Sequence, residues 1–306
     1  MAQEKRYSFA AATRVGEVLG QVDGQDVYGA NATISGFAAG DVEVGQTNDG
    51  NKVVNVSLPL NNTGKKITGA LGLTEAADET LWVRVAFFDN DNVNLATRAE
   101  KAIAKGKLLI VNGYVKAREY KGKVYFDMTA NDFKISWSKD KGRSVGGEYS
   151  WVSARKANKE GNGIIALEGF VGGDPELKVT PNGKELMSFS MAVNKGENKL
   201  RYPLGIDKAD EPRERVWITI NAWKEESNSY LFDRVAKAVK AGQGLLIHGM
   251  LSAKEGEKGH FYNVNLNDFD VLRAAGEKNG GGEGADTTQA PEPNVPDIQL
   301  DDDIPF

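Results

Sequence analysis

Cysteine is absent from the chain, and histidine is nearly so, with only His248 and His260 among 306 residues. A chain without thiols can form no disulfide, no thiolate metal site and no cysteine nucleophile. The two imidazoles do not follow the spacing of a metal-binding motif. We therefore expect no metal and no cofactor, and the lack of disulfides suits a reducing, cytoplasmic compartment.

Long hydrophobic runs are also lacking. No stretch approaches the roughly 20 apolar residues that a membrane-spanning helix needs. The N-terminal segment carries Lys5 and Arg6, but Arg14 and Glu17 soon interrupt the alanine-rich stretch that follows, so the core of a signal peptide is missing. We expect no membrane partner.

Motifs of nucleotide-binding and calcium-binding proteins are incomplete. The segment Thr63-Gly-Lys-Lys-Ile-Thr68 lacks the upstream glycine of a phosphate-binding loop. The segment Asp89-Asn-Asp-Asn92 begins like a calcium loop without its glycine and closing glutamate, which favours a turn that caps a helix. His248 lies in an apolar stretch, where a structural histidine is the common case. No pattern in the sequence indicates a catalytic site, and we expect that the protein is not an enzyme.

Negative charge is concentrated in the C-terminal segment. The net charge is −5, but residues 273–306 hold eight acidic and two basic residues and so carry −6. The rest of the chain therefore carries +1, and a nearly neutral body can still present a basic groove. The overall acidity does not argue against a nucleic-acid partner.

The chain contains two copies of one pattern, offset by 133 to 136 residues. This self-similarity predicts two copies of one domain. The matched segments are Ala32-Thr-Ile-Ser-Gly-Phe37 with Ile165-Ala-Leu-Glu-Gly-Phe170, Gly40-Asp-Val-Glu43 with Gly173-Asp-Pro-Glu176, Trp82 with Trp217, Arg98 with Arg234, Gly106 with Gly242, Gly113 with Gly249, and Asn131-Asp-Phe133 with Asn267-Asp-Phe269.

Alternating apolar residues predict five strands in the first copy. One amphipathic helix, with Leu95, Ala99 and Ile103 on one face, lies between the third and fourth strands and ends at Gly106. This order is that of the OB-fold, a five-stranded, partly open barrel. A β-sandwich is the alternative, but a helix recurring at the same place in both copies fits it poorly. The predicted strands lie near 31–41, 53–60, 81–88, 107–119 and 123–135, with a polar loop over 61–79.

The predicted organisation is all-β, with two tandem OB-folds and one helix in each. Beyond about residue 273 the composition of Gly, Glu, Asp, Thr and Pro is typical of disorder. Tyr7-Ser-Phe9 faintly echoes Tyr149-Ser-Trp151, which suggests a small element leading into each copy. The predicted boundaries are 1–29 for an N-terminal extension, 30–137 for the first OB-fold, 138–162 for a linker, 163–272 for the second OB-fold and 273–306 for a disordered acidic tail.

The third predicted strand of each copy places aromatic residues on a face that the core does not need. Side chains alternate across a strand, and one side of each of these strands is uniformly apolar. The other side mixes polar groups with large rings, which a merely solvated face would seldom carry. The residues on this mixed side are Trp82, Arg84 and Phe88 in the first copy and Trp217 and Trp223 in the second.

The fourth predicted strand adds cations and further aromatics to this face. Sequence-tolerant binding of single-stranded nucleic acid needs rings on which bases stack and cations along the phosphates. The alternative is that these aromatics fill the core or a subunit interface, as aromatics commonly do. The second copy is leaner and has Gly256 where the first has Tyr120. The added candidates are Tyr114, Lys116, Arg118, Tyr120, Lys121 and Lys123 in the first copy and Lys254 and Phe261 in the second.

The chain ends on apolar residues after a run of acids. A segment that only added solubility would have no need of a final phenylalanine. Such a residue can fill a pocket while its carboxylate and the neighbouring acids meet basic residues of a partner. We expect a docking peptide that consists of Asp301, Asp302, Asp303, Ile304, Pro305 and Phe306.

Three features resemble the bacterial single-stranded DNA-binding protein family, in its variant with two OB domains. They are Gly169-Phe-Val-Gly-Gly-Asp-Pro-Glu176, the strand with two aromatics six residues apart and its following helix, and the terminal Asp-Asp-Asp-Ile-Pro-Phe. The resemblance covers most of residues 31–135 and 164–272 and the last six. It implies stacking of single-stranded DNA on Trp82, Phe88, Tyr120, Trp217 and Trp223, and recruitment of replication, recombination and repair proteins by Asp301 to Phe306.

The resemblance also implies a homodimer with four OB-folds, associated with the nucleoid in a bacterial cytoplasm. The N-terminal extension and the short turns between the fourth and fifth strands depart from the common pattern of the family. Two other functions fit parts of the sequence. One is an OB-fold adaptor whose aromatic faces hold proteins, and the other is a DNA-processing enzyme that uses carboxylates and a divalent ion.

Overall fold

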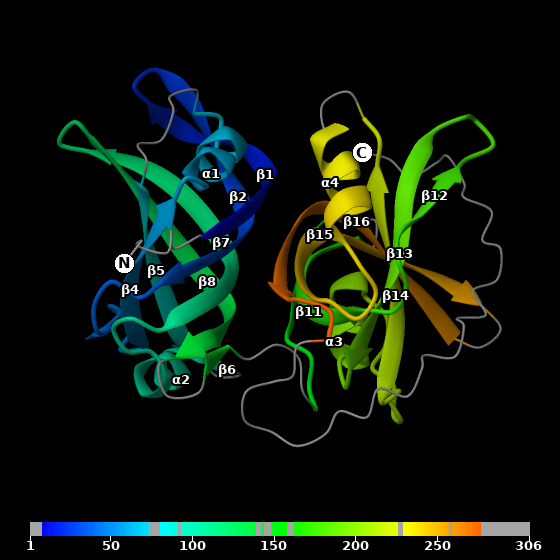
Figure 1. The fold of residues 1–306 in the computed structure, drawn as a ribbon. Helices are drawn as coiled ribbons and strands as arrows, with labels where there is room; N and C mark the ends of the chain where they lie inside the picture. Colours follow the sequence, from blue (N-terminus) through cyan, green and yellow to red (C-terminus); the bar gives the residue numbers. More distant parts are fainter. Residues whose placement is uncertain are drawn as a thin grey trace, which may run out of the picture. The chain divides into compact units, whose positions relative to one another are not determined.

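The computed structural model describes residues 8–73, 80–90, 93–138, 142–143, 148–157, 162–225, 229–256 and 259–276. It divides into two compact units, Met1–Ser144 and Val145–Phe306, which we call domain 1 and domain 2. The division falls inside the segment 138–162 that the sequence predicts as a linker. Each domain is a strongly curved sheet with short helices, so the predicted all-β class and the two OB-folds are confirmed (Figure 1).

The sheet of domain 1 has the strand order β1-β2-β7-β8-β5-β4-β3, with β6 paired to β5 and β9 to β8. The pairs are antiparallel except β5 with β8, which is parallel. The elements are β1 (Phe9–Val22), β2 (Gln25–Phe37), β3 (Glu43–Gln46), β4 (Lys52–Asn61), α1 (Gly64–Ala70), β5 (Thr80–Asn90), β6 (Val93–Asn94), α2 (Leu95–Ala102), β7 (Leu108–Tyr120), β8 (Lys123–Ser138) and β9 (Gly142–Arg143).

The sheet of domain 2 repeats this topology with the order β10-β11-β15-β16-β14-β13-β12, and an added pairing of β11 with β13 closes it. Here too one pair, β14 with β16, is parallel. The elements are β10 (Val152–Lys156), β11 (Gly163–Val171), β12 (Glu176–Val179), β13 (Glu185–Asn194), α3 (Glu197–Arg201), the 3₁₀ turn η1 (Tyr202–Leu204), β14 (Arg215–Trp223), α4 (Ser229–Ala238), β15 (Gly244–Gly256) and β16 (Gly259–Arg273).

Two segments assigned outside the OB-folds belong to the sheets. The predicted extension 1–29 contains β1, which pairs with β2 from Phe9 onward, and the predicted linker 138–162 contains β10, which pairs with β11. The prediction missed β1 because its paired stretch begins with alanines, which have weak strand propensity.

The similarity between Tyr7-Ser-Phe9 and Tyr149-Ser-Trp151 has a structural basis in their serines. Ser8 Oγ donates to the carbonyl oxygen of Asn61 at 2.9 Å, at the end of β4. Ser150 Oγ accepts a hydrogen bond from the backbone N–H of Asn194 at 3.0 Å, at the end of β13. The repeated serines therefore attach the leading strand of each domain to the same place in each barrel.

Each domain has one helix more than the sequence predicts. Helix α1 lies in the segment 61–79 that was predicted as a loop, and α3 with η1 occupies the corresponding segment of domain 2. Ile67 and Leu71 join the core of domain 1, as Leu200 and Leu204 join that of domain 2. Helices α1 and α3 lie at the barrel ends opposite the predicted helices α2 and α4 (Figure 1). At seven and five residues, they are too short to show a helical period.

The repeated Asn-Asp-Phe motif forms a β-bulge in each domain. Asn131 is the extra residue of β8 opposite the step from Asn112 to Gly113, and Asn267 is its counterpart in β16. A Cβ atom at Gly113 would lie 2.2 Å from the carbonyl oxygen of Thr129, so only glycine fits the close approach. Because a bulge bends its strand, the motif helps to curve each sheet.

The aspartate of the motif also fixes the predicted helix. Arg98 on α2 lies 3.3 Å from Asp132, and Arg234 on α4 lies 2.6 Å from Asp268. Each guanidinium also lies over the ring of the phenylalanine that follows the aspartate. The matched arginines of the two copies thus attach a helix to the bulge of the last strand.

Among the residues that the structure describes, no helix is long and apolar enough to cross a membrane. His248 on β15 is fully buried and is paired in register with Ala166 and Asp268. Burial lowers the pKa of His248 to about 4 from 6.5, against the opposing effect of the Asp268 charge. The imidazole is therefore neutral in the folded protein at pH 7.

We predict that His248 makes the stability of domain 2 depend on pH. Between pH 6.5 and pH 4 the unfolded chain binds a proton that the folded protein does not, so stability falls as the pH falls through this window. At 1.36 kcal/mol per pKa unit, the loss approaches about 3 kcal/mol. Denaturant unfolding at several pH values should show that His248→Gln removes this part of the dependence.

The matched control is His260→Gln, which removes the other imidazole, a partly exposed one on the neighbouring strand. An identical pH profile for wild type and His248→Gln would contradict the assignment.

Candidate nucleic-acid interface

Strand β5 has the alternation that the sequence predicts. Val83, Val85 and Phe87 are fully buried in the core of domain 1. On the other side, the Trp82 side chain is 55% exposed, Arg84 is exposed and Phe88 is half-buried. The indole of Trp82 is therefore on the surface and is no part of the core.

The sheet register places a row of charges beside these rings. Arg84 on β5 is paired with Asp127 on β8, and Asp127 is in turn paired with Lys116 on β7. We call Arg84, Asp127 and Lys116 the charged row. Both cations are exposed, so two positive groups flank one carboxylate on the outer face of the sheet.

Each tyrosine of this face has a cation above its ring. The Lys116 ammonium lies 5.6 Å from the ring centre of Tyr114, and the Lys121 ammonium lies 5.1 Å from that of Tyr120. The Arg118 guanidinium lies 4.9 Å from the ring centre of Tyr125. These pairs combine a π-face with a positive charge, as binding to a strand of bases and phosphates requires.

Arg118 is also held by a carboxylate. Its Nε donates to Asp127 Oδ2 at 2.6 Å, and this hydrogen bond and the negative charge raise the pKa of Arg118. Asp127 therefore offsets part of the positive charge of the face. Asp127 is not among the residues that the sequence predicts for this face, although it lies on the same side of β8 as Tyr125.

The remaining candidates of domain 1 lie on one long hairpin. Strands β7 and β8 are joined by the turn Lys121-Gly122, in which both residues have positive φ, and Lys121 and Lys123 are exposed beside Tyr120. Tyr120 is 53% exposed at the end of β7. Tyr114 lies nearer the barrel and is half-buried, with its hydroxyl over Gly29 of β2. The hairpin extends from domain 1 as a green ribbon (Figure 1).

The two tryptophans of domain 2 are more enclosed than Trp82. Trp217 is half-buried against Gly172, where a Cβ atom would lie 2.4 Å from Cζ3 of the indole. Trp223 is half-buried and donates from Nε1 to Asn265 Oδ1 at 3.1 Å. Both rings thus lie on the predicted side of β14 but are fixed by neighbours on the sheet.

The row that corresponds to the charged row is neutral in domain 2. Thr219 on β14 is paired with Asn263 on β16, which is paired with Ser252 on β15. We call Thr219, Asn263 and Ser252 the neutral row. Lys254 on β15 is exposed. The half-buried ring of Phe261 on β16 lies over Gly256 of β15, which is the position that corresponds to Tyr120 in domain 1.

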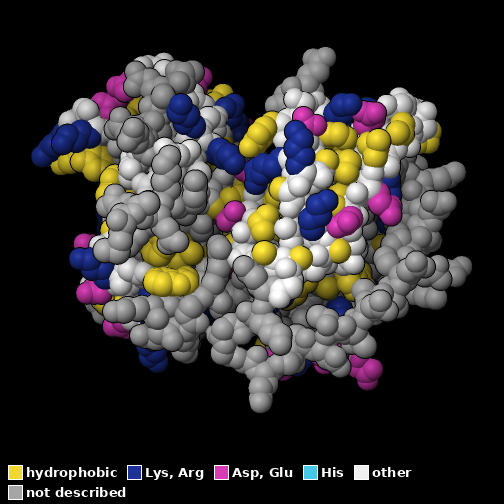
Figure 2. Space-filling model, in the orientation of Figure 1, with side chains coloured by type: hydrophobic (Ala, Val, Ile, Leu, Met, Phe, Trp, Pro, Cys, Tyr) yellow, Lys and Arg dark blue, Asp and Glu magenta, His cyan; other side chains and the backbone are white. Residues whose placement is uncertain are grey.

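The surface carries basic side chains interspersed with hydrophobic ones on the face that Figure 2 shows. Among the described residues of domain 2, three exposed aromatics were not predicted as contacts: Tyr149 before β10, Tyr202 in η1 and Tyr230 in α4, at 62%, 80% and 73% exposure. None of them lies on a strand, so the alternation of a strand could not indicate them. The docking peptide Asp301 to Phe306 lies outside the described residues.

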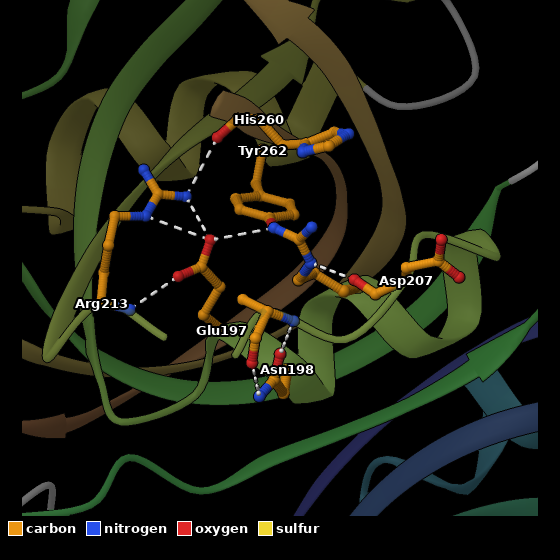
Figure 3. A network of polar contacts seen from close by, with 8 residues as sticks. Glu197, Asn198, Asp207, Arg213, His260 and Tyr262 are labelled. Atoms are coloured by element: carbon orange, nitrogen blue, oxygen red, sulfur yellow. Dashed lines mark hydrogen bonds and ion pairs between the residues drawn. The ribbon is translucent and has the colours of Figure 1, made fainter. Parts of the chain in front are cut away.

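A buried carboxylate fixes the segment between β13 and β14 (Figure 3). Glu197 is 4% exposed, and its Oε1 accepts from Nη2 and Nε of Arg213 at 2.7 and 3.1 Å. Its Oε2 accepts from the backbone N–H of Arg213 at 2.8 Å, and Arg201 lies 3.5 Å away. Asn198 exchanges two hydrogen bonds with the backbone of Ala209 in the same segment.

The pKa of Glu197 reflects two opposing effects. Burial raises it, but the hydrogen bonds and charge of Arg213, with the charge of Arg201, bring the net value below the ordinary 4.5. The carboxylate is ionised and fully bonded, which favours a structural role. Among the described residues, no group of three or more His, Cys, Asp or Glu side chains is placed to hold a metal ion.

Comparisons with known proteins agree with the fold. The Single-strand binding protein family matches residues 30–132 and again residues 164–267. The single-stranded DNA-binding protein of Wolinella succinogenes is 27% identical over 173 residues, which cover 46% of this chain and 98% of that protein. The protein of the same name from Halalkalibacterium halodurans is 26% identical over 137 residues, which cover 43% of this chain and 73% of that protein.

Solved structures of similar proteins were also found. The single-stranded DNA binding protein from Thermus aquaticus is 16% identical, covering 82% of this chain and 95% of that one, with a TM-score of 0.26. The small single-stranded DNA-binding protein from Streptomyces coelicolor is 19% identical, covering 34% of this chain and 88% of that one, with a TM-score of 0.25.

Each domain contains the five strands of an OB barrel, with a helix between the third and fourth, and two such barrels define a tandem OB-fold protein. These strands are β2, β4, β5, β7 and β8 in domain 1 and β11, β13, β14, β15 and β16 in domain 2. Because the family match repeats and spans more than half of the sequence, the chain belongs to the single-strand binding protein family.

We predict that Glu197→Gln destabilises domain 2 by about 1–3 kcal/mol, since buried hydrogen-bonding groups lose a charged partner. Because the folded pKa of Glu197 is lowered, this stabilisation is present above pH 4.5 and is lost as the pH falls through the folded value. Denaturant unfolding at pH 7 and at pH 3 should therefore show a difference that shrinks in acid.

Glu185→Gln is the matched control, because it breaks the exposed ion pair with Lys224 in the same domain. Exposed pairs contribute less than about 1 kcal/mol. Equal effects of the two substitutions would show that Glu197 does not fix the segment.

Proposed function

We propose that this protein binds single-stranded DNA with little sequence preference, on the outer face of the sheet in each domain, and that it is not an enzyme. The observation that carries the proposal is the exposed indole of Trp82 beside the charged row. Membership of the single-strand binding protein family supports it. So do the relatives from Wolinella succinogenes and Halalkalibacterium halodurans, which bear the name single-stranded DNA-binding protein.

The physical basis is stacking combined with charge. A base that stacks on an aromatic side chain contributes about 1–3 kcal/mol, and the single-strand binding proteins are among the systems behind that figure. Cations beside the rings neutralise phosphates and release counterions. The proposed contacts are Trp82, Arg84, Phe88, Tyr114, Lys116, Arg118, Tyr120, Lys121 and Lys123 in domain 1 and Trp217, Trp223, Lys254 and Phe261 in domain 2.

The proposal extends to protein partners through the C-terminal docking peptide. The acidic residues before Ile304 suit a basic surface, and Phe306 suits an apolar pocket with a cation for the carboxylate. Replication, recombination and repair proteins are the proposed partners. We also propose that two copies of the chain form a homodimer with four OB-folds, and that the protein acts in a bacterial cytoplasm.

Two measurements separate this function from the alternatives. A metal-dependent DNA-processing enzyme would degrade single-stranded DNA during hours with Mg²⁺ or Mn²⁺. An adaptor whose aromatic faces hold proteins would lose its protein partner on addition of oligo-dT. Under our proposal the DNA stays intact, and partners bound through the docking peptide remain bound when DNA is added.

We predict that oligo-dT quenches the tryptophan fluorescence of the protein, with a log affinity that falls with log salt by about 0.7 per phosphate neutralised.

We predict that Trp82→Ala weakens the binding of oligo-dT about tenfold, within the range of one lost stacking contact. Trp217→Ala should cost less, because its ring is more enclosed and has fewer cations nearby.

Tyr230→Ala is the control for these titrations, since it removes an exposed aromatic from helix α4 and not from a sheet face. Its affinity should equal that of the wild type. No quenching and no retention of labelled single strands by the wild-type protein would refute the proposed function, and a larger loss for Trp217→Ala than for Trp82→Ala would reverse the ranking of the domains.

We predict that deletion of Asp301 to Phe306 leaves the affinity for oligo-dT unchanged and abolishes the capture of DNA-processing proteins. Replacing Phe306 alone by Ala tests the apolar anchor. Unchanged capture of partners by the deleted protein would refute the docking role.

A further inference from the structure

The two sheet faces have the same architecture but different chemistry. The charged row and the neutral row occupy the same three register positions, with one residue each on β5, β8 and β7 in domain 1 and on β14, β16 and β15 in domain 2. The sequence offsets are 135 residues for Arg84 and Thr219 and 136 for the other two pairs. Three positions that carry full charges in domain 1 thus carry a hydroxyl, an amide and a hydroxyl in domain 2.

The next row of register positions also differs between the domains, although it is uncharged in both. Domain 1 has Ala86 paired with Thr129 and Thr129 paired with Tyr114. At the corresponding positions domain 2 has Asn221 and Asn265. Asn221 is 5% exposed, and Asn265 accepts the hydrogen bond from Trp223. Asn221 on β14 and Asn265 on β16 are therefore paired neighbours, and Asn265 is bound to the indole of Trp223.

These two kinds of side chain recognise different parts of a nucleic acid. An exposed cation binds any phosphate, so its contribution depends strongly on salt and does not depend on the base. An asparagine side chain carries hydrogen-bond donors and an acceptor, and a hydroxyl group can donate or accept. Both can therefore form hydrogen bonds with the donors and acceptors on the edge of a base. Such neutral hydrogen bonds release no counterions.

We infer that the two domains divide the binding of one strand between them. Domain 1 binds the phosphate chain through the charged row and gives most of the salt dependence. Domain 2 binds base edges through the neutral row and gives a preference among bases. The inference rests on the proposed function, and it adds nucleobase edges as the group recognised by domain 2.

Two full-length variants separate the two contributions. In the first, Arg84→Thr and Lys116→Ser give domain 1 the residues that domain 2 has at the same positions. In the second, Thr219→Ala, Ser252→Ala and Asn263→Ala remove the hydrogen-bonding groups of the neutral row. All six positions of the two rows lie on an outer face and are partly or fully exposed, and circular dichroism checks that both variants fold.

The probes are oligo-dT and oligo-dC of equal length, whose bases are alike in size but present different donors and acceptors on their pairing edges. Affinity for each is measured over a series of salt concentrations. The wild type should discriminate about three- to tenfold between them, the effect of about one neutral hydrogen bond.

The charged-row variant should lower the slope of log affinity against log salt by about 1.4, for two phosphate contacts, and keep the ratio between the two oligonucleotides. The neutral-row variant should keep the slope and reduce the ratio to about 1. A wild-type ratio of 1, a neutral-row variant that keeps the ratio, or a charged-row variant that keeps the slope would each overturn the inference while leaving single-strand binding intact. A wild-type protein that binds neither oligonucleotide would overturn the proposed function and the inference together.

Discussion

The alternation of side chains across a strand governs the rest of this structure. Because the barrel interior takes every second residue of β5 and β14, the residues between them must face outward. The inner residues are all buried and apolar, and they are Leu81, Val83, Val85 and Phe87 on β5 and Val216, Ile218, Ile220 and Ala222 on β14. The outer rings and charges are therefore available for binding without loss of core packing, and the faces can change chemistry while the fold stays the same.

The conserved parts of the repeat are those that hold the barrel in shape. The pairs Gly113 and Gly249, Asn131 and Asn267, and Arg98 and Arg234 recur because a bulge, a close backbone approach and a helix attachment depend on them. The outer positions differ, because domain 2 has amides and hydroxyls where domain 1 has charges. One scaffold thus carries two surfaces, each built on the same register of three strands.

The sequence predicts well whatever depends on a regular period or a repeat. The five strands of each OB barrel, helices α2 and α4, and the outward direction of Trp82 follow from alternation, from helical spacing and from matched residues. Strand β1 was missed because alanines give little strand signal, and α1 and α3 because they are too short for a period. Asp127 was not singled out because no charge pattern in the sequence shows which strand lies next to β8. The pairing of Glu197 with Arg213 joins irregular segments, which no local pattern encodes.

We propose that the outer face of β5, β7 and β8 contacts the bases of single-stranded DNA, as does its counterpart in domain 2. Photo-cross-linking tests this contact, with oligo-dT in which 5-iodouracil replaces thymine and with mass spectrometry of the linked peptides. Base contacts on these faces should give cross-links at Trp82 and at Tyr120 or Tyr125 in domain 1, and at Trp217 or Trp223 in domain 2. Cross-links confined to residues away from these strands, such as Tyr230 on α4, would contradict it.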